Sequence, residues 1–367
     1  MPLEVLQIII EPSTFLKRDF IFGDDGVTVM QEQMIKVQAE ALHALVVDRL
    51  TEVGMAVSEA TIVADVLVFA DLRGTHSHGV LRVEHYANRI RHGGINLAAD
   101  LAVQAIKPAV GLIDAAGGMG HIAAKRATKA AIVRAKEHGV GLVGVRNCSH
   151  CGALAYYVDM VLQEHLAAML LVNTDKCVVP FGGREPFFGT NPFAFGFPGR
   201  RQSILLDMAT SEVAFGKIFY ARQRNTPIPG RWAVDQSGTA TTDPHAAHAL
   251  FPFGGVKGYG INLMVEALTG LLVGGAFGPH IVPMYAQLDR LRNVSSLHLV
   301  IDPVLFCGAT VFSDTQALID ELHAQPTASG TEAVMIPGEI EAQTMQRSLS
   351  EGIAVPEAVY RYLVAGA

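Results

Sequence analysis

The segment 73–86, RGTHSHGVLRVEHY, combines side-chain types that a small organic acid would need. An imidazole in a glycine-flanked turn, as at His78, stays accessible and titrates near neutrality. The guanidinium of Arg82 offers a planar two-point fit to a carboxylate that lysine cannot match. A helix that begins early would place His78, Arg82 and Tyr86 along one edge, because residues four apart share a helix face. On spacing alone, a solvated helix charge explains Arg82 equally well.

A second imidazole, His150, lies in the polar turn SHCG and is equally able to accept a proton. Oxidation of a 2-hydroxy acid requires a base for the hydroxyl proton, a cation for the carboxylate and a hydride acceptor. Either His78 or His150 can be that base. A lone histidine more often has a structural role, so residue type alone does not choose between the two.

The runs THSH at 75–78 and CSHC at 148–151 contain residue types that also bind zinc. Their spacing matches no standard zinc site, so we predict no bound metal. A metal-dependent hydrolase that uses these histidines and cysteines is the alternative from a different class, and it would lose activity to chelators.

Thr174 and Asp175 follow AAMLLVN, an apolar run typical of a strand. A short acid at a strand end can accept hydrogen bonds from ribose hydroxyls and repel a 2′-phosphate. Asp175 therefore predicts NAD rather than NADP. A loop cap explains the same residue equally well on local grounds.

Composition narrows the class of protein. Of the 367 residues, 50% are hydrophobic and 17% are charged, which favours a folded chain with more than one subdomain. The net charge of −7, without a dense Lys/Arg run, disfavours nucleic acid and anionic membranes as partners. Four cysteines are too few for a disulfide framework. We expect a cytoplasmic protein with no signal peptide and no transmembrane segment.

Hydrophobic spacing predicts helices near the N-terminus. The first lies within 34–54 and ends at Gly54, and the second is capped by Ser58 and terminated by Gly74. A third helical pattern covers 80–92, directly after the HSHG turn.

The middle of the chain contains short apolar runs separated by Gly, Pro, Asn and Asp, which predict strands. These runs are VGLIDA, VGLVGV, AAMLLVN, FAFGF, SILLDMA and LHLVIDPVLF. Helix-compatible sequence returns at 260–273, 313–324 and 356–363. The predicted layout is helical, then α/β, then helical, with no internal repeat.

The run VGLIDAAGGMG, followed by a helical pattern and VGLVGV, has the order in which a Rossmann fold begins. GGMG lacks the GxGxxG spacing, however, and the second strand ends in Arg146 and Asn147, where an acid for the ribose would be expected. We therefore do not predict a Rossmann fold.

Several further motifs occur in one order: DLRGTHSHGVLRVEHY, SHCGALAYY, VVPFGG, GTNPFAF, DMATSEVAFGK and KGYG. Together they resemble the malate/L-lactate dehydrogenase family, which lacks a Rossmann fold, over about residues 34–340. Within the family, RNTPIPGRWAVDQSGTATTDP and MYAQLDRLRN followed by LHLVIDP are most similar to the branch that acts on ureidoglycolate.

The resemblance implies roles for individual residues. It implies His150 as the proton acceptor, with His78 and Ser77 lining the substrate site. Arg82 and Tyr86 would hold the substrate. The residues that it implies for the cofactor are Thr174, Asp175, Asp207, Met208, Ala209, Lys257, Arg292, Gly338 and Glu339. The last two belong to a PGE turn that would close over the cofactor.

The resemblance also implies an α/β (α+β) fold, in which a non-Rossmann cofactor domain has a mixed sheet with helices and a helical domain is formed from both chain ends. The implied boundaries are an N-terminal extension at 1–33, a helical domain at 34–105 and 305–367, and an NAD-binding α/β domain at 106–304. A homodimer is implied as well.

The activity that the resemblance implies is NAD-dependent oxidation of (S)-ureidoglycolate to oxalurate by hydride transfer, in purine catabolism. A related malate, lactate or sulfolactate dehydrogenase, or a 2-oxo acid reductase, is the alternative within the same class.

Overall fold

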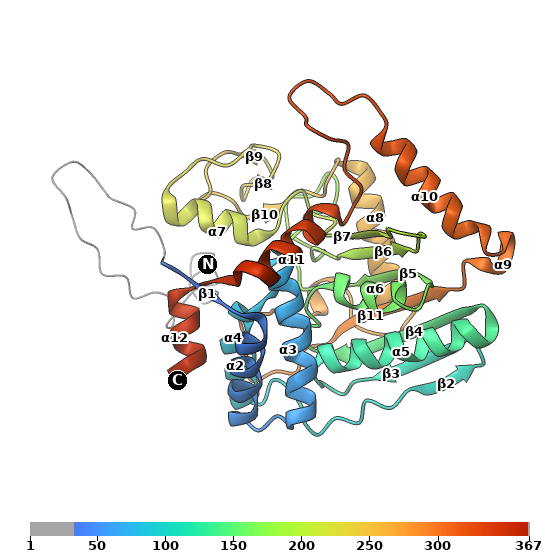
Figure 1. Ribbon diagram of the computed structural model, residues 1–367. Helices are drawn as coiled ribbons and strands as arrows, with labels where there is room; N and C mark the ends of the chain where they lie inside the picture. The colour runs from blue at the N-terminus through green and yellow to red at the C-terminus, as the bar shows by residue number, and fades with distance from the viewer. Residues whose placement is uncertain (1–32, 366–367) are drawn as a thin grey trace.

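A computed structural model describes residues 33–365 of the chain, and its centre is a seven-stranded sheet. Figure 1 shows the strands in the order β2-β3-β4-β11-β5-β6-β7. They are β2 (Gln104–Lys107), β3 (Val110–Asp114), β4 (Val140–Cys148), β5 (Ala167–Val172), β6 (Phe193–Phe197), β7 (Ile204–Met208) and β11 (Val294–Ile301). Only β3 and β4 run parallel, and the other neighbouring pairs are antiparallel. The predicted mixed sheet is confirmed, and the predicted strands lie in it with one correction. The run LHLVIDPVLF is a strand only as far as Ile301, because Pro303 cannot donate to a sheet, and the last three residues of the run belong to a short helix.

Helices cover both faces of this sheet. On one face α5 (Gly120–His138) and α6 (Leu154–Leu162) pack over β4, β5 and β6. On the other face α8 (Val256–Glu266), continued by a π-helical turn at Ala267–Leu271, packs over β5 and β11. Successive side chains of a strand point to opposite faces of the sheet. Because helices cover both faces, successive positions are buried, and this explains why the strands appear in the sequence as nearly continuous apolar runs.

The GGMG turn lies in a βαβ unit, β3-α5-β4, in which the two strands are parallel as at the start of a Rossmann fold. The similarity to a Rossmann fold does not extend beyond this unit. The next neighbour of β4 is the antiparallel β11, which comes from far along the chain. A Cβ atom on Gly120 would lie 2.3 Å from the carbonyl oxygen of Ser149. This glycine therefore permits close contact between the start of α5 and the segment that follows β4.

The predicted N-terminal helices are present as α2 (Ala39–Glu52) and α3 (Val57–Leu72). Gly54 and Gly74 follow them with positive φ angles of 95° and 79°, as terminating glycines should. The predicted cap at Ser58 is wrong. The helix begins one residue earlier, and Ala56 precedes it without a side-chain cap. Most residues in the second half of α3 are buried. We attribute the position of the helix start to this packing rather than to a capping side chain.

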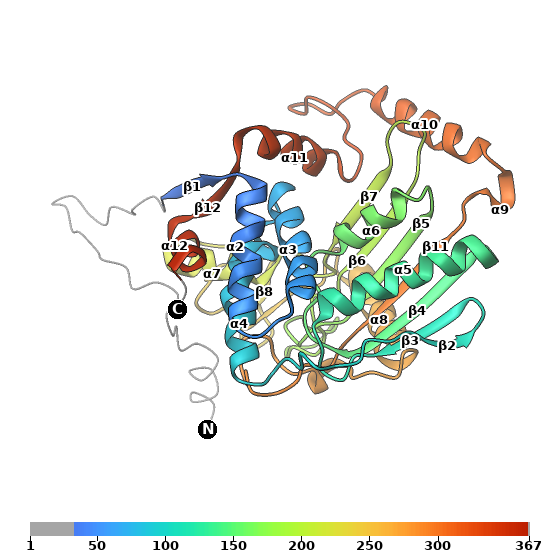
Figure 2. The same cartoon turned by 60° about the horizontal axis from the view of Figure 1, so that its bottom comes forward.

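The HSHG turn is a 3-10 helix at His76–His78, and a second 3-10 turn at Val80–Arg82 leads into α4 (Val83–Arg91). The helical pattern predicted for 80–92 is confirmed, with its first turn tighter than an α-helix. Figure 2 shows α4 beside α2 and α3, next to one end of the central sheet.

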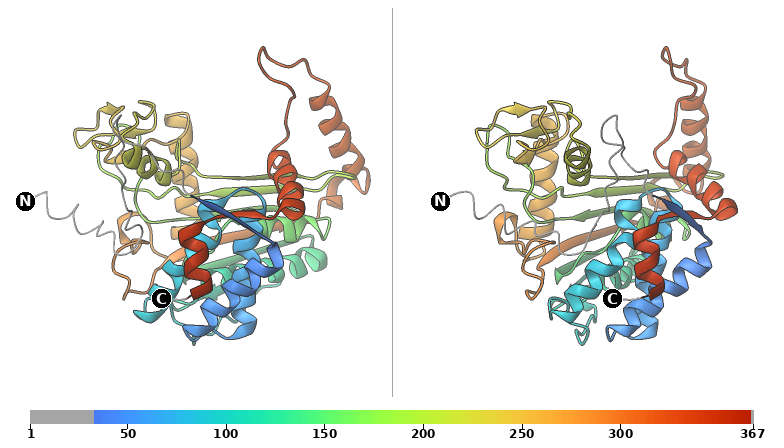
Figure 3. Two further views of the ribbon diagram at one scale, coloured as in Figure 1. Left: turned by 60° about the vertical axis from the view of Figure 1, so that its left-hand side comes forward. Right: turned by 90° about the vertical axis from the view of Figure 1, so that its left-hand side faces the viewer.

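The two ends of the described chain meet in a second sheet, where β1 (Met34–Val37) pairs with β12 (Ile353–Pro356). The neighbouring helix α11 (Glu339–Glu351) packs on α3, and α12 (Glu357–Ala365) packs on α2, as Figure 3 shows. Helix α11 lies outside the predicted helices. The helical domain proposed for 34–105 and 305–367 includes these paired chain ends. The predicted N-terminal extension at 1–33 lies, except for Gln33, outside the described residues.

Helix α10 (Thr310–His323), preceded by the short α9 (Val304–Cys307), lies apart from the helices of the chain ends (Figure 1). It contacts the loop between β6 and β7, where Arg201 pairs with Asp320 and the Arg200 amide donates to Phe312 O. The C-terminal segment therefore touches both the sheet and the N-terminal helices.

A smaller lobe carries its own apolar cluster (Figure 3). It consists of α7 (Phe215–Arg224) and a three-stranded sheet of β8 (Ala233–Val234), β9 (Ala240–Thr241) and β10 (Ala249–Leu250). Within residues 33–365, we find no helix with the length and apolar character needed to cross a membrane.

Candidate active site

The HSHG turn is organised by the carboxylate of Asp71 at the end of α3. Its Oδ2 accepts a hydrogen bond from the Val80 amide at 2.7 Å, and its Oδ1 lies 2.8 Å from His76 Nδ1. The Asp71 side chain is buried. A Cβ atom on Gly79 would lie 2.1 Å from this carboxylate, so the turn requires glycine there for space. Sequence reasoning did not assign Asp71 a role.

His78 and Arg82 are linked through Ser77. The Ser77 hydroxyl shares a 2.9 Å hydrogen bond with His78 Nδ1, and Arg82 Nε donates to the Ser77 carbonyl oxygen at 2.7 Å. Burial, reinforced by the charge of Arg82, lowers the pKa of His78 to about 4. The imidazole of His78 is therefore neutral at neutral pH, while the neighbouring guanidinium keeps its charge.

His150 comes from the segment between β4 and α6 and faces residues of the HSHG segment. Its Nδ1 lies 2.6 Å from Tyr86 Oη, and its ring stacks on His78 with centroids 5.5 Å apart. The Gly152 amide donates a hydrogen bond to the same nitrogen at 3.2 Å. This contact needs a lone pair on Nδ1, so the neutral imidazole carries its proton on Nε2 and the Tyr86 hydroxyl donates to Nδ1. Burial, followed by the charges of His78 and Arg82, lowers the pKa of His150 well below its usual value.

Two histidines that sequence reasoning missed complete this cluster. The buried ring of His121 lies 5.2 Å from Tyr86 and 6.1 Å from His150, and burial lowers its pKa to about 3. His85 lies 5.2 Å from the ring of Tyr285. His121 follows the GGMG glycines, but only the β3-α5-β4 contact brings it to His150. No local sequence signal could have shown that.

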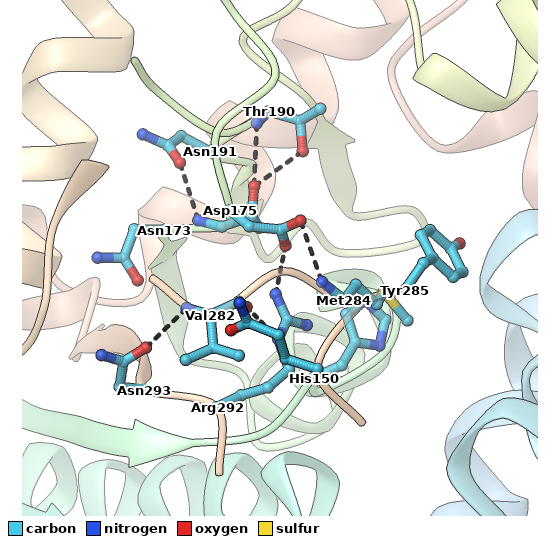
Figure 4. A network of polar contacts seen from close by, with 12 residues as sticks. His150, Asn173, Asp175, Thr190, Asn191, Val282, Met284, Tyr285, Arg292 and Asn293 are labelled. Carbon is cyan, nitrogen blue, oxygen red and sulfur yellow. Dashed lines mark hydrogen bonds and ion pairs between the residues drawn. The ribbon is translucent and has the colours of Figure 1, made fainter. Parts of the chain in front are cut away.

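A second arginine, Arg292, lies near the same cluster. Its guanidinium forms an ion pair with Asp175 and donates from Nε to the Val282 carbonyl oxygen at 3.0 Å. The other oxygen of Asp175 accepts a hydrogen bond from the Met284 amide at 3.2 Å. Figure 4 shows Arg292 between Asp175 and His150. Asp175 thus ties the end of β5 to the segment before β11.

Thr174 is directed toward the GTNP loop. Its Oγ1 accepts a hydrogen bond from the Thr190 amide at 2.9 Å, and its own amide donates to Asn191 Oδ1 at 2.9 Å. A Cβ atom on Gly189 would lie 2.0 Å from Thr174 Oγ1. This glycine accordingly has a packing role.

A cavity of about 650 Å³ lies between α6, the β6-β7 loop and the start of α11. Arg73, Gln202, Gly338, Glu339 and Gln343 are among the residues that line it. Gly338 has a φ of 95°, and a Cβ there would lie 2.7 Å from Leu205 O. The PGE turn thus forms one wall of this cavity.

Asp207, in β7, contacts the segment that follows His150. Its Oδ2 accepts a hydrogen bond at 2.8 Å from the amide of Ala155, five residues after His150. Although the residue is exposed to solvent, the protein packed around it raises its pKa to about 6, against the opposing effect of the hydrogen bond from Ala155 and of the Arg73 charge. Met208 and Ala209 follow at the end of β7.

The candidate residues thus form two groups. One contains His150, His78, Ser77, Arg82 and Tyr86, with Arg292 and Asp175 beside it. The other contains Gly338 and Glu339 at the cavity, and Asp207, Met208 and Ala209 lie at the end of β7, outside its lining. Lys257 lies exposed in the first turn of α8, and no described contact joins it to either group.

We find no cluster of three or more histidine, cysteine or acidic side chains suited to a metal ion among residues 33–365. In the THSH and CSHC motifs, His76 pairs with Asp71, and both thiols are buried. Burial raises the pKa of Cys148 to about 12. This thiol is therefore not a ready thiolate ligand.

Comparison with known proteins bears on the chemistry of this site. A family described as malate/L-lactate dehydrogenase matches residues 37–364. The chain is 40% identical over 335 residues to the NAD(+) ureidoglycolate dehydrogenase of Escherichia coli, covering 91% of this chain and 96% of that protein.

Two solved structures have the same fold. The sulfolactate dehydrogenase of Methanocaldococcus jannaschii aligns with a TM-score of 0.85 at 35% identity, covering 90% of this chain and 95% of that chain. The malate dehydrogenase of Pyrococcus horikoshii aligns with a TM-score of 0.81 at 34% identity, covering 90% and 93%.

Proposed function

The chain belongs to the malate/L-lactate dehydrogenase family, whose members act on 2-hydroxy acids, and we propose that it oxidises (S)-ureidoglycolate to oxalurate with NAD as hydride acceptor. The observation that carries the proposal is the pair of His150 and Tyr86, stacked on His78 beside Arg82. The ureidoglycolate dehydrogenase relative supports this substrate and NAD.

His150 is the proposed base. Its imidazole takes the proton of the substrate hydroxyl, and Tyr86 Oη, 2.6 Å from Nδ1, is a hydrogen-bond partner for the imidazolium that forms. The hydroxyl carbon loses its hydrogen as hydride, and the hydroxyl oxygen becomes the carbonyl oxygen of oxalurate. Bound NAD supplies the acceptor for that hydride.

Arg82 is the proposed clamp for the substrate carboxylate. Its guanidinium is held by the Ser77 carbonyl and contacts the hydroxyl of Tyr285. The charges of Arg82 and Arg292 both act on His150 and Tyr86, so both guanidinium groups lie within electrostatic reach of the base. A carboxylate beside two guanidinium groups gains charge-assisted hydrogen bonds.

The cavity with the PGE turn suits part of a dinucleotide. Its volume falls in the range of cofactor pockets, roughly 300–1,000 Å³, and the glycine at 338 leaves space that a Cβ would fill. Arg73 supplies a positive charge, and the amide groups of Gln202 and Gln343 supply hydrogen-bonding partners. Arg73 also lies four residues before Ser77 in the chain.

We also propose a cytoplasmic homodimer, as the family resemblance implies. Exposed apolar side chains of α8 and the turn after it, among them Leu263, Leu271 and Leu272, support a second copy as the occupant of that surface.

The proposed reaction can be followed through NADH absorbance with purified protein and NAD. We expect ureidoglycolate to give a higher kcat/KM than malate, lactate or sulfolactate, and EDTA to leave the rate unchanged. A higher kcat/KM with malate or sulfolactate would move the substrate assignment to that acid. Absence of turnover with the whole panel in both directions would refute the proposed dehydrogenase activity.

The pH profile tests the assignment of His150. A base acts only when unprotonated, and burial lowers the pKa of His150 well below 6.5. We therefore expect kcat/KM to remain full at pH 6.5 and to fall only as pH drops through that lowered pKa. His150→Gln should reduce kcat by about 10²–10⁴-fold with little change in NAD affinity. An acid limb centred above pH 6.5, or normal turnover of the variant, would contradict the assignment.

The assignment of Asp175 predicts the cofactor preference. Replacing the acid by Ser removes the negative charge that would repel a 2′-phosphate, so Asp175→Ser should raise kcat/KM for NADP relative to NAD. Asp48→Ser, on the exposed face of α2, is the matched control. If Asp175→Ser leaves the NAD/NADP ratio unchanged, Asp175 acts only through its pair with Arg292 and the Met284 amide.

A further inference from the structure

Arg89, on the buried side of α4, holds the loop that precedes β11. Its Nη1 donates to the Met284 carbonyl oxygen at 2.9 Å, and its Nη2 donates to those of Arg290 at 2.9 Å and Gln287 at 3.3 Å. The side chain is 1% exposed. Burial lowers the pKa of Arg89 to about 10, so the guanidinium stays charged at neutral pH.

The close approach of α4 to this loop is supported from a second position. A Cβ atom on Gly94 would lie 2.0 Å from the carbonyl oxygen of Leu288. Only a glycine therefore allows the chain after α4 to lie against the loop, which we call the 282–292 loop.

The 282–292 loop contributes to the substrate side of the proposed active site from two points. The hydroxyl of Tyr285 contacts Arg82, whose Cζ lies 5.5 Å from the tyrosine ring. The Met284 amide donates to Asp175, which pairs with Arg292. The loop thus connects to both guanidinium groups proposed to attract the substrate carboxylate.

We propose that Arg89 is a positioning residue for the substrate carboxylate: by binding three carbonyl groups of the 282–292 loop, it fixes Tyr285 against Arg82 and sets the spacing between Arg82 and Arg292. Arg89 itself points into the loop and touches no reacting atom. This inference rests on the proposed function, because it assumes that Arg82 holds the substrate.

The three contacts require the shape of a guanidinium. Arginine presents several N–H groups in a rigid planar fork, whereas lysine presents a single compact ammonium group on a flexible stem. Lysine at position 89 keeps the positive charge but cannot hold carbonyls at both Met284 and Arg290 with the same geometry. Arg89→Lys therefore tests the geometry of the hydrogen bonds while the positive charge at this position is kept.

The test is a kinetic comparison of wild type with Arg89→Lys, using ureidoglycolate and NAD. We expect KM for the hydroxy acid to rise about tenfold, with kcat changed by less than about twofold. Arg91→Lys is the matched control, because Arg91 is exposed on the same helix and donates to Asn88 rather than to the loop. A variant with wild-type KM for the hydroxy acid, or one in which kcat falls as much as that KM rises, would overturn the proposal.

A double-variant cycle tests whether Arg89 acts through Tyr285. Tyr285→Phe removes the hydroxyl that contacts Arg82 at a position 54% exposed, so folding should not suffer. We expect KM for the hydroxy acid to rise several-fold, and the double variant to be no worse than Arg89→Lys alone. Independent, multiplying effects would contradict the proposal. If Arg89→Lys does not fold, Tyr285→Phe decides it, and an unchanged KM overturns it.

Hydrogen exchange separates failure of this inference from failure of the proposed function. In Arg89→Lys, amides of the 282–292 loop should exchange faster than in wild type, while those of α5 stay protected. If the wild type oxidises no 2-hydroxy acid, the proposed function fails and this readout still shows whether Arg89 holds the loop. Unchanged exchange there would overturn the positioning role.

Discussion

The buried carboxylate of Asp71 is the contact on which the proposed active site depends. It accepts hydrogen bonds from the Val80 amide and from His76, and it thereby joins the last turn of α3 to the HSHG turn. A buried N–H without its partner costs about 1–3 kcal/mol, so the turn is strongly biased to this one conformation. The turn in turn presents the Ser77 carbonyl, which orients Arg82.

The site combines neutral imidazoles with permanently charged guanidinium groups. Burial lowers the pKa of His78 and of His150, whereas arginine retains its proton far above neutral pH even when its pKa falls. The same enclosed region can therefore offer an unprotonated base and a carboxylate clamp at one pH. These groups come from three places: the HSHG segment, the turn between β4 and α6, and the segment before β11. Their arrangement depends on contacts such as those of Asp71 and Asp175 rather than on any one element.

The sequence predicted the parts whose signal is local. Apolar runs bounded by turn residues located the strands of the central sheet, and glycines such as Gly54 and Gly74 marked the ends of helices. The Ser58 cap was wrong because tertiary packing of α3 outweighed a local preference. Family motifs led to His150 and Arg82, whose grouping the structure describes. Arg89 and His121 were missed because their contacts join residues that are far apart in the sequence. Arg89 and Met284 are 195 positions apart, and hydrophobic periodicity cannot predict a contact over that separation.

The most direct test of this account is the kinetic effect of Asp71→Asn, a substitution that keeps size but replaces one carboxylate oxygen by an amide group. Since the amide cannot serve both the Val80 N–H and His76 as an acceptor, the turn should loosen, and kcat/KM for the hydroxy acid should fall at least about tenfold while the dissociation constant for NAD stays unchanged. Wild-type kinetics in a folded Asp71→Asn protein would contradict the claim that this carboxylate organises the site.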